Sequence, residues 1–236
     1  MVAGTLANAG YFMGYDLLPP RTSNPKGYFE SREINAANES ILAEVTPNKP
    51  WLLGKWFFSN HFGPTQRWLA RVPLETEIPS TPAIMDHIQQ LVQREPYCFK
   101  DPRFSYTLSV WRPFLRNAVF ICVFRDPAST AISILRECQE RYLRSIYMDF
   151  DRALEVWTLM YRHVLEIHRH EGEWLFIHYN QVLEQEGLKR IERLVGTQVD
   201  RSFPDPALRR SFSNQPVPTE TWQIYEHLCS LGENDP

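Results

Sequence analysis

Short apolar runs alternate with longer amphipathic segments along this chain. The clearest apolar run is "AVFICVF" at residues 118–124, and "EWLFIHY" at residues 173–179 has the same character. Runs of this length that are rich in β-branched and aromatic residues predict buried strands. A shorter strand that ends in charged residues is predicted at "YCFKDPR", residues 97–103.

Apolar residues recur at helical spacing in most of the sequence between these strands. The spacing predicts helices at residues 1–10, 31–45, 81–95, 107–115, 126–144, 151–170 and 180–196. Ser31, Thr81 and Asp126 stand at helix caps, and Gly196 ends the last of these helices. Strands that alternate with helices predict an α/β fold, in which a parallel sheet of four or five strands has helices on both faces as a three-layer arrangement.

The length and composition fit one soluble globular domain. The chain has 236 residues, of which 43% are hydrophobic and 22% are charged. We expect residues 1–203 to form this domain and the proline- and serine-rich residues 204–236 to form a tail that is partly loop. The net charge of −3 gives no sign of a basic surface that would bind nucleic acid. Any anion-binding site must therefore be formed by a few nearby residues.

Neither a membrane span nor an export signal is visible in the sequence. The apolar runs are shorter than the roughly 18–20 residues of a membrane span, and the first residues lack a basic start and a cleavage site. The four cysteines lack metal-ligand spacing, so no metal is expected, and Cys98 and Cys122 are expected to act as small hydrophobes within strands. A reducing cytoplasm is the expected location.

Two predicted strands are followed by the same pattern of residue types. "CFKDPR" at 98–103 and "CVFRDP" at 122–127 each place a basic residue and then Asp-Pro where the strand stops. Ligands of open parallel sheets bind at the carboxyl ends of strands, and a helix N-terminus favours a phosphate. Arg125 offers a forked, permanently charged donor, and Ser133 follows eight residues later. The alternative is that Arg125 only forms a salt bridge near the sheet edge, with Asp126 as a plain helix cap.

The segment "VFRDPASTAIS", residues 123–133, resembles the 3′-phosphate-binding segment of sulfotransferases that use 3′-phosphoadenylyl sulfate (PAPS). In that family an arginine ends a strand and a serine eight positions later binds the same phosphate, which Arg125 and Ser133 match. Further segments resemble bacterial members of the family in the same order along the chain. They are residues 14–42, 99–112, 153–168 and 174–196, and the likeness covers the chain from residue 1 to about 196.

The resemblance implies a P-loop NTPase-like fold and the transfer of a sulfuryl group from PAPS to a hydroxyl or amine, without a metal. Glu30 in "KGYFES" is the first candidate for the base that such a transfer needs, and Asp101 is the second. Lys100 is expected to contact the moving sulfuryl group, and Lys26 to line the entrance. Alternatively, Glu30 is a solvated acid of a surface loop. For Lys100 and Arg103 the alternative is an ion pair with Asp101 or another acid.

Tyr179 closes the "FIHY" strand and is expected to pack beside the nucleotide; its alternative is a core tyrosine with a satisfied hydroxyl. The acceptor stays open, with carbohydrate, lipid, peptide and other small molecules all possible, and so does the oligomeric state. The aromatic residues of one stretch are expected to line an acceptor pocket or to form a satellite core. They are Trp51, Trp56, Phe57, Phe58 and Trp68.

The sequence departs from the family at its beginning. The family normally opens with a buried strand and a phosphosulfate-binding loop such as "PRSGTS", and Met1 aligns with the residue just after that loop. Two interpretations follow: Met1 is an internal methionine of a longer protein, or the chain is a shortened, non-catalytic relative that binds nucleotide or a partner. A kinase of the same sheet class would need a GxxxxGK[ST] loop, which residues 1–236 also lack.

The histidines of "HVLEIHRH" do not have the spacing of a helical zinc pair. His163 and His168 are five residues apart, and His168 and His170 are two apart. We expect them to be surface residues of an amphipathic helix.

Overall fold

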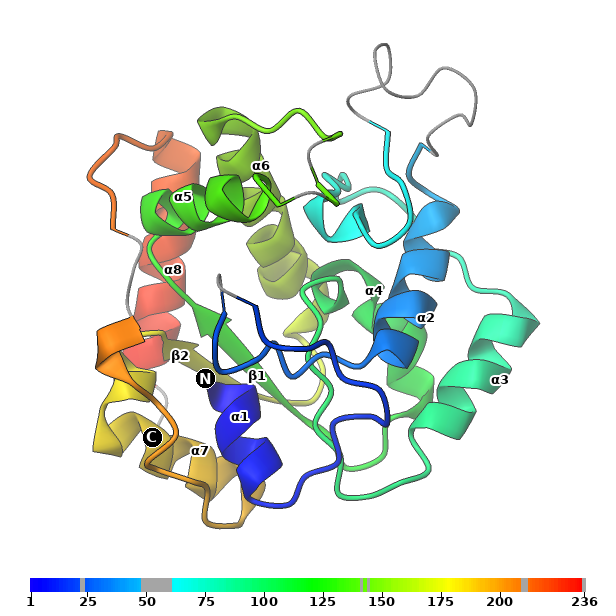
Figure 1. The fold of residues 1–236 in the computed structure, drawn as a ribbon, viewed down its shortest axis with the longest axis vertical. Helices are drawn as coiled ribbons and strands as arrows, with labels where there is room; N and C mark the ends of the chain where they lie inside the picture. The colour runs from blue at the N-terminus through cyan, green and yellow to red at the C-terminus, as the bar shows by residue number, and fades with distance from the viewer. Residues whose placement is uncertain (22–23, 48–60, 141, 144, 209–211, 235–236) are drawn as a thin grey trace.

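The computed structural model describes residues 1–21, 24–47, 61–140, 142–143, 145–208 and 212–234. Figure 1 shows two strands, β1 (Val119–Phe124) and β2 (Glu173–His178), in the middle of the molecule with helices around them. The α-helices are α1 (Val2–Asn8), α2 (Arg32–Ala43), α3 (Pro82–Leu91), α4 (Phe104–Trp111), α5 (Pro127–Glu137), α6 (Phe150–Arg162), α7 (Gln185–Val195) and α8 (Thr219–Asn234). The shorter helical turns are η1 (Arg67–Leu69), η2 (Arg112–Phe114), η3 (His163–His168), η4 (Gln181–Leu183) and η5 (Pro206–Leu208).

The two strands pair in parallel, in a register that sets Val119 opposite Glu173 and Phe124 opposite His178. The Tyr179 N–H donates to the Phe124 carbonyl at 2.7 Å and extends the ladder beyond β2. Parallel strands need a crossover connection, and α5 and α6 lie in the chain between them. The predicted α/β class and parallel pairing are therefore confirmed.

The sheet is smaller than the sequence predicts. Of the four or five expected strands, the described residues form two, and residues 97–103 contribute only a parallel bridge between Phe12 and Tyr97. This segment bonds to Phe12 on one edge, and residues 97–99 line a cavity instead of pairing with a neighbouring strand.

Helices pack on both faces of the two strands. On one face, Ile177 and Leu175 pack with α1 and α7 through Val2, Leu6 and Ile191. The apolar cluster on the other face joins the strands to α6 and α8, and its buried members are Cys122, Phe124, Trp157, Val164, Leu165, Phe176 and Leu228. Residues 204–236 thus contain, besides loop, a helix that packs on β2 (Figure 1).

The outer edge of β2 is closed by side chains. The backbone N–H of His178 donates to the Gln181 side chain at 2.8 Å, and the Phe176 carbonyl accepts from the Arg190 guanidinium at 3.4 Å. The same guanidinium donates to the Gly232 carbonyl of α8 at 2.7 Å. Two backbone groups at this edge therefore have side-chain partners, and the described residues place no third strand there.

The predicted helix signals are confirmed in most places. Asp126 accepts from the Ser129 N–H at 2.7 Å and Thr81 from the Ile84 N–H at 3.3 Å, and each precedes a proline in the first turn. Gly196 ends α7 in the left-handed conformation, with φ of 68°. Ser31 precedes α2 as predicted, but its hydroxyl makes no capping bond.

None of the helices in the described ranges is long and apolar enough to cross a membrane. The four cysteines are free. Burial raises the pKa of Cys98 and of Cys122 to about 12, so both thiols stay protonated at neutral pH. Their expected role as small hydrophobes in the interior is confirmed.

The prediction that His163 and His168 are surface residues is wrong. Their exposed fractions are 1% and 2%. The helix continues beyond Arg162 as a π-helical turn, which turns both rings inward, where His163 Nε2 lies 2.9 Å from the Val72 carbonyl and His168 Nε2 3.1 Å from that of Ser105. Since a carbonyl only accepts, each Nε2 atom carries a proton and donates it to the facing carbonyl.

These histidines predict a loss of stability in acid. Burial, followed by the nearby His163, lowers the pKa of His168 to about 4, and burial lowers that of His163 as well. An unfolded chain binds the proton near pH 6.5, so between the two pKa values the unfolded state holds more protons. The free energy of unfolding should therefore fall as the pH drops from about 7 to about 4, by about 3 kcal/mol for His168 alone.

The measurement is urea unfolding of the parent chain and of His168→Gln across this pH range. Glutamine keeps a donor for the Ser105 carbonyl but does not titrate, so its stability should change less with pH. The exposed His87 provides the control His87→Gln, which should follow the parent curve. Equal pH dependence of the parent and His168→Gln would show that the ring is not held neutral.

Candidate functional site

A large cavity runs along β1 and is lined by residues 118–123. Its volume is about 1080 Å³, at the upper end of the range of about 300–1,000 Å³ found for ligand pockets. Three predicted site residues, Lys100, Asp101 and Tyr179, line it. Its lining includes the buried Trp111 and the exposed Arg116, so the cavity connects the interior with the surface.

Glu30 is held inside the molecule. Its loop is fixed by backbone bonds from the Leu18 N–H to the Glu30 carbonyl and from the Arg32 N–H to the Asp16 carbonyl, each 2.8 Å. The carboxylate has an ion pair with the Lys100 ammonium and accepts from Asn35 Nδ2 at 3.1 Å. With an exposed fraction of 7%, Glu30 is not a solvated loop acid. The structure therefore brings two of the three predicted catalytic residues into direct contact.

The Asp101 side chain is buried, and both of its carboxylate oxygens accept hydrogen bonds. It accepts from Asn38 Nδ2 at 3.0 Å, and from both the backbone N–H and the Nη1 of Arg103 at 2.9 Å. Burial raises its pKa, and the Arg103 guanidinium acts in the opposite direction. The alternative of pairing with an acid holds for Arg103, which pairs with Asp101 and Glu39, and also for Lys100, which pairs with Glu30. Between the two candidate bases, the geometry favours Glu30, because Asp101 anchors the strand end.

A buried ionic network that the sequence did not reveal supports this corner. Glu39 of α2 accepts from Arg67 Nη1 at 2.7 Å through one oxygen and from Arg103 Nε at 2.8 Å through the other. The neighbouring Asn38 accepts at 2.7 Å from both the Thr107 hydroxyl and the Trp111 indole N–H. The one available signal was the position of Asn38, which shares the apolar face of the helix with Ile34 and Ile41.

The second group of predicted residues lies at the carboxyl ends of β1 and β2. The Arg125 guanidinium stacks over the Tyr179 ring, with its carbon 4.9 Å from the ring centroid. Asp126 caps α5, and Ser133 lies about two turns further along that helix, on its exposed side. The strand ends thus bring Arg125 and Tyr179 together, and neither Arg125 nor Ser133 points into the packed interior.

Lys26 does not occupy the place expected for it. Its ammonium contacts the Phe203 carbonyl, lies 4.9 Å from the centroid of the Phe203 ring and is 3.9 Å from an Asp205 oxygen. Lys26 therefore contacts the segment that follows α7 instead of lining the cavity. Asn24 and Gly27, which are close to it in the chain, do line the cavity.

Of the expected aromatic cluster, only Trp68 lies within the described residues, and it both lines the cavity and packs against an apolar cluster. The other four members lie outside the described residues, and they are Trp51, Trp56, Phe57 and Phe58.

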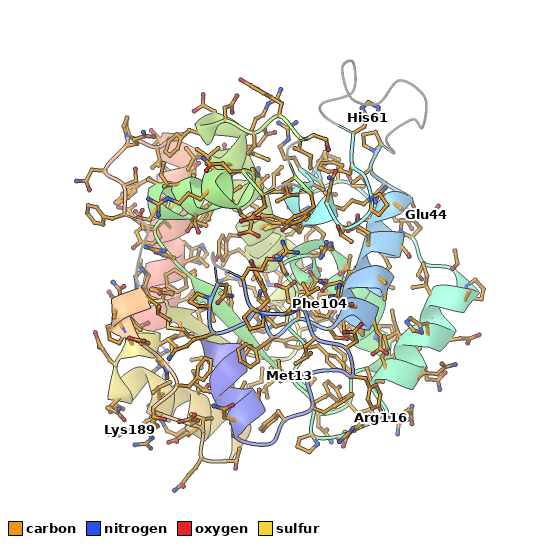
Figure 2. The ribbon with its side chains drawn as sticks, in the orientation of Figure 1. Met13, Glu44, His61, Phe104, Arg116 and Lys189 are labelled. Atoms are coloured by element: carbon orange, nitrogen blue, oxygen red, sulfur yellow. The ribbon has the colours of Figure 1, made fainter. Side chains whose placement is uncertain are left out.

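The network predicts a strong effect of Glu39→Gln. The substitution removes the charge that balances two buried guanidinium groups, and breaking a buried ion pair typically costs about 3–5 kcal/mol. The free energy of unfolding, measured in urea, should fall by about 3 kcal/mol. The matched control is Glu44→Gln at the exposed end of the same helix (Figure 2), with an expected change within about 0.5 kcal/mol. Equal effects of the two substitutions would contradict the network.

The model of the sulfotransferase family matches residues 24–201, more than half of the chain. The matched span contains the Glu30–Lys100 pair as well as Arg125, Ser133 and Tyr179. No curated protein and no solved structure matches the chain in the corresponding searches. The chain belongs to the sulfotransferase family.

Proposed function

We propose that this protein transfers a sulfuryl group from 3′-phosphoadenylyl sulfate to a hydroxyl or amine of a small-molecule, carbohydrate or lipid acceptor. Membership of the sulfotransferase family supports sulfuryl transfer. The observation that carries the choice of donor is the Arg125 guanidinium, stacked on Tyr179 at the carboxyl end of β1 beside the N-terminus of α5. A 3′-phosphate distinguishes this donor from ordinary adenine nucleotides.

The proposed phosphate site combines three contributions. Arg125 supplies a forked, permanently charged donor, and its contact with Tyr179 limits the freedom that it would lose on binding. Ser133 offers a hydroxyl on the exposed side of α5. The N-terminus of α5 adds a partial positive charge, which favours an anion in this position. Tyr179 also lines the cavity, so a nucleotide bound here would have its base and sugar beside an aromatic ring.

The Glu30–Lys100 pair fits the chemistry of the transfer. In the proposed reaction a Glu30 oxygen takes the proton of the acceptor group, whose oxygen or nitrogen then forms a bond to sulfur. The bond between sulfur and the bridging phosphate oxygen breaks, and adenosine 3′,5′-bisphosphate leaves. Lys100 has a flexible side chain that is 43% exposed, so it can leave Glu30 for the sulfuryl oxygens when the acceptor arrives. Positive charge at those oxygens stabilises the transition state.

All four cysteines are free, which supports a reducing compartment, and we infer the cytoplasm. The runner-up is a non-catalytic member of the family that binds the nucleotide or a partner. It predicts binding of adenosine 3′,5′-bisphosphate without product release from any acceptor, and the next two experiments separate it from the enzyme.

Nucleotide binding is tested by thermal unfolding with adenosine 3′,5′-bisphosphate. Ligand at a hundred times its Kd stabilises the native state by about 2.7 kcal/mol, which raises the melting temperature by several degrees. The rise should exceed that with ATP, and Arg125→Ala should abolish it because the charged donors to the phosphate are lost. Arg136→Ala, in the exposed last turn of α5, is the control and should keep the rise. An unchanged rise in Arg125→Ala would refute the phosphate assignment.

The role of Glu30 is tested by Glu30→Gln, with release of adenosine 3′,5′-bisphosphate from the donor measured over a panel of acceptors. Loss of a general base lowers the rate by about 10²–10⁴-fold. The nucleotide-induced rise in melting temperature should persist, since Glu30 does not contact the phosphate site. Glu33→Gln, on the next helix, should retain activity. Full activity of Glu30→Gln would assign the base elsewhere.

A further inference from the structure

Glu30 follows a short stretch of backbone in an unusual conformation. Gly27 and Phe29 have φ of 96° and 54°, both in the left-handed region. Glycine adopts such angles readily, but they are uncommon for a residue as bulky as phenylalanine. A backbone conformation of this kind persists only where surrounding contacts impose it. The direction of the Glu30 carboxylate therefore depends on the contacts that hold the Glu30 loop, residues 26–30.

Two anchors hold the Glu30 loop. The first is Phe203, whose ring packs edge-to-face against the Phe29 ring with 5.4 Å between the centroids. The second is Glu137, the last residue of α5, whose Oε1 accepts from the Tyr28 hydroxyl at 3.2 Å. Phe203 belongs to the segment after α7, whereas α5 is the helix that carries Ser133. The Glu137 anchor therefore joins the loop of the candidate base to the helix of the proposed phosphate site.

The stability of its own helix does not explain Glu137. It ends α5, and the C-terminus of a helix carries a partial negative charge that disfavours a carboxylate there. Two hydroxyl groups compensate for this, because the Tyr142 hydroxyl donates to the same Oε1 at 3.0 Å. The Arg21 guanidinium stacks over the Tyr142 ring, with its carbon 4.7 Å from the centroid. The carboxylate therefore connects α5, the residues that follow it and the Glu30 loop.

Both hydrogen bonds to Glu137 have a fixed direction. An ionised carboxylate only accepts, so each tyrosine hydroxyl donates. Burial, followed by the Glu137 carboxylate, raises the pKa of Tyr142, so this hydroxyl keeps its proton at neutral pH. Hydrogen bonds to a charged acceptor are roughly twice as strong as neutral ones. Removal of one hydroxyl takes away one donor and leaves the other in place, so the two bonds can be tested separately.

The proposed reaction is sensitive to the position of Glu30. A general base acts within hydrogen-bonding reach of the proton that it takes, about 2.6–3.2 Å between heavy atoms. A displacement of about 1 Å can lower a rate about a hundredfold. Phe29, with its left-handed backbone, lies between Tyr28 and Glu30 in the chain. Release of the Tyr28 hydroxyl therefore allows this backbone to relax, and the relaxation turns the carboxylate of Glu30.

We propose that Glu137 is a positioning residue for the transfer, and that it acts through Tyr28 to hold the carboxylate of Glu30 in place. The inference rests on the proposed function, since it takes Glu30 as the base. Tyr28 lines the cavity and Glu137 does not, so Glu137 acts through another residue rather than on the substrates. Ser133 precedes Glu137 by four residues, about one helical turn. One helix thus joins the proposed phosphate site to the base.

The test compares two substitutions that each remove one hydroxyl from the same carboxylate. Tyr28→Phe should lower kcat for release of adenosine 3′,5′-bisphosphate from the donor by about 10–100-fold. Its KM for the donor should stay unchanged, since Arg125 and Ser133 are not altered. The matched control is Tyr142→Phe, which removes the other donor to Glu137 Oε1 and should keep the kcat of the parent chain.

A second pair of variants addresses Glu137 itself. Glu137→Ala removes both hydrogen bonds and should lower kcat as Tyr28→Phe does. Glu137→Gln keeps an oxygen that accepts from the Tyr28 hydroxyl, so it should restore most of the rate. Alanine and glutamine are both good helix formers, so α5 accommodates either substitution. A merely structural role of Glu137 would change the melting temperature without this difference in kcat between the two variants.

Hydrogen exchange reports on the Glu30 loop independently of activity. The Leu18 N–H donates to the Glu30 carbonyl at 2.8 Å, so its exchange rate measures how well the backbone at Glu30 is held. Exchange of this amide should become about tenfold faster in Tyr28→Phe, because the loop opens more often. In Tyr142→Phe it should equal that of the parent chain.

Equal kcat in Tyr28→Phe and Tyr142→Phe would overturn the inference. So would a higher KM for the acceptor at unchanged kcat in Tyr28→Phe, because Tyr28 would then be a contact of the acceptor. Failure of the proposed function gives a different result, in which the parent chain releases no adenosine 3′,5′-bisphosphate with any acceptor. The exchange of the Leu18 amide then decides by itself, and equal rates in the two phenylalanine variants reject the role of Glu137.

Discussion

The buried guanidinium of Arg103 is the interaction on which the rest of this structure depends. It bonds to Asp101 in its own segment, to Glu39 of α2 and to the Thr65 carbonyl. A buried charge is tolerated only when it is fully paired, so these three segments have one mutual arrangement. That arrangement holds the segment that carries Lys100 against α2, the helix that follows Glu30, and the candidate site is built between them.

Polar and apolar residues occupy different regions along the direction of the strands. Charged and polar groups gather where the strands end, as expected for an open parallel sheet. The interior beside β1 is lined by apolar side chains, and among the described residues β2 is the only strand that pairs with β1. The polar and the apolar region share one cavity, because Lys100 and Asp101 line it together with residues 118–123.

The sequence predicted what depends on local spacing and missed what depends on distant contacts. Periodicity located α1 to α7 and both strands, but it missed α8 in the expected tail, and the spacing of Arg125 and Ser133 pointed to the ends of β1 and α5. The partner of Glu30 is 70 residues away, and no local pattern specifies such a pair. The burial of His163 and His168 was missed for a related reason. A π-helical turn changes which residues face inward, and the ordinary helical period does not describe it.

The contact of Lys26 with Phe203 has a consequence for the time course of folding. It joins residues 177 positions apart and fastens the loop that carries Glu30 to the segment after α7. Closing so long a loop is entropically costly, and contacts between distant residues form slowly. We therefore expect the Glu30 loop to be among the last parts of the chain to become ordered. A nascent or partly folded molecule can already have its helices and its β1–β2 ladder while still lacking a competent centre.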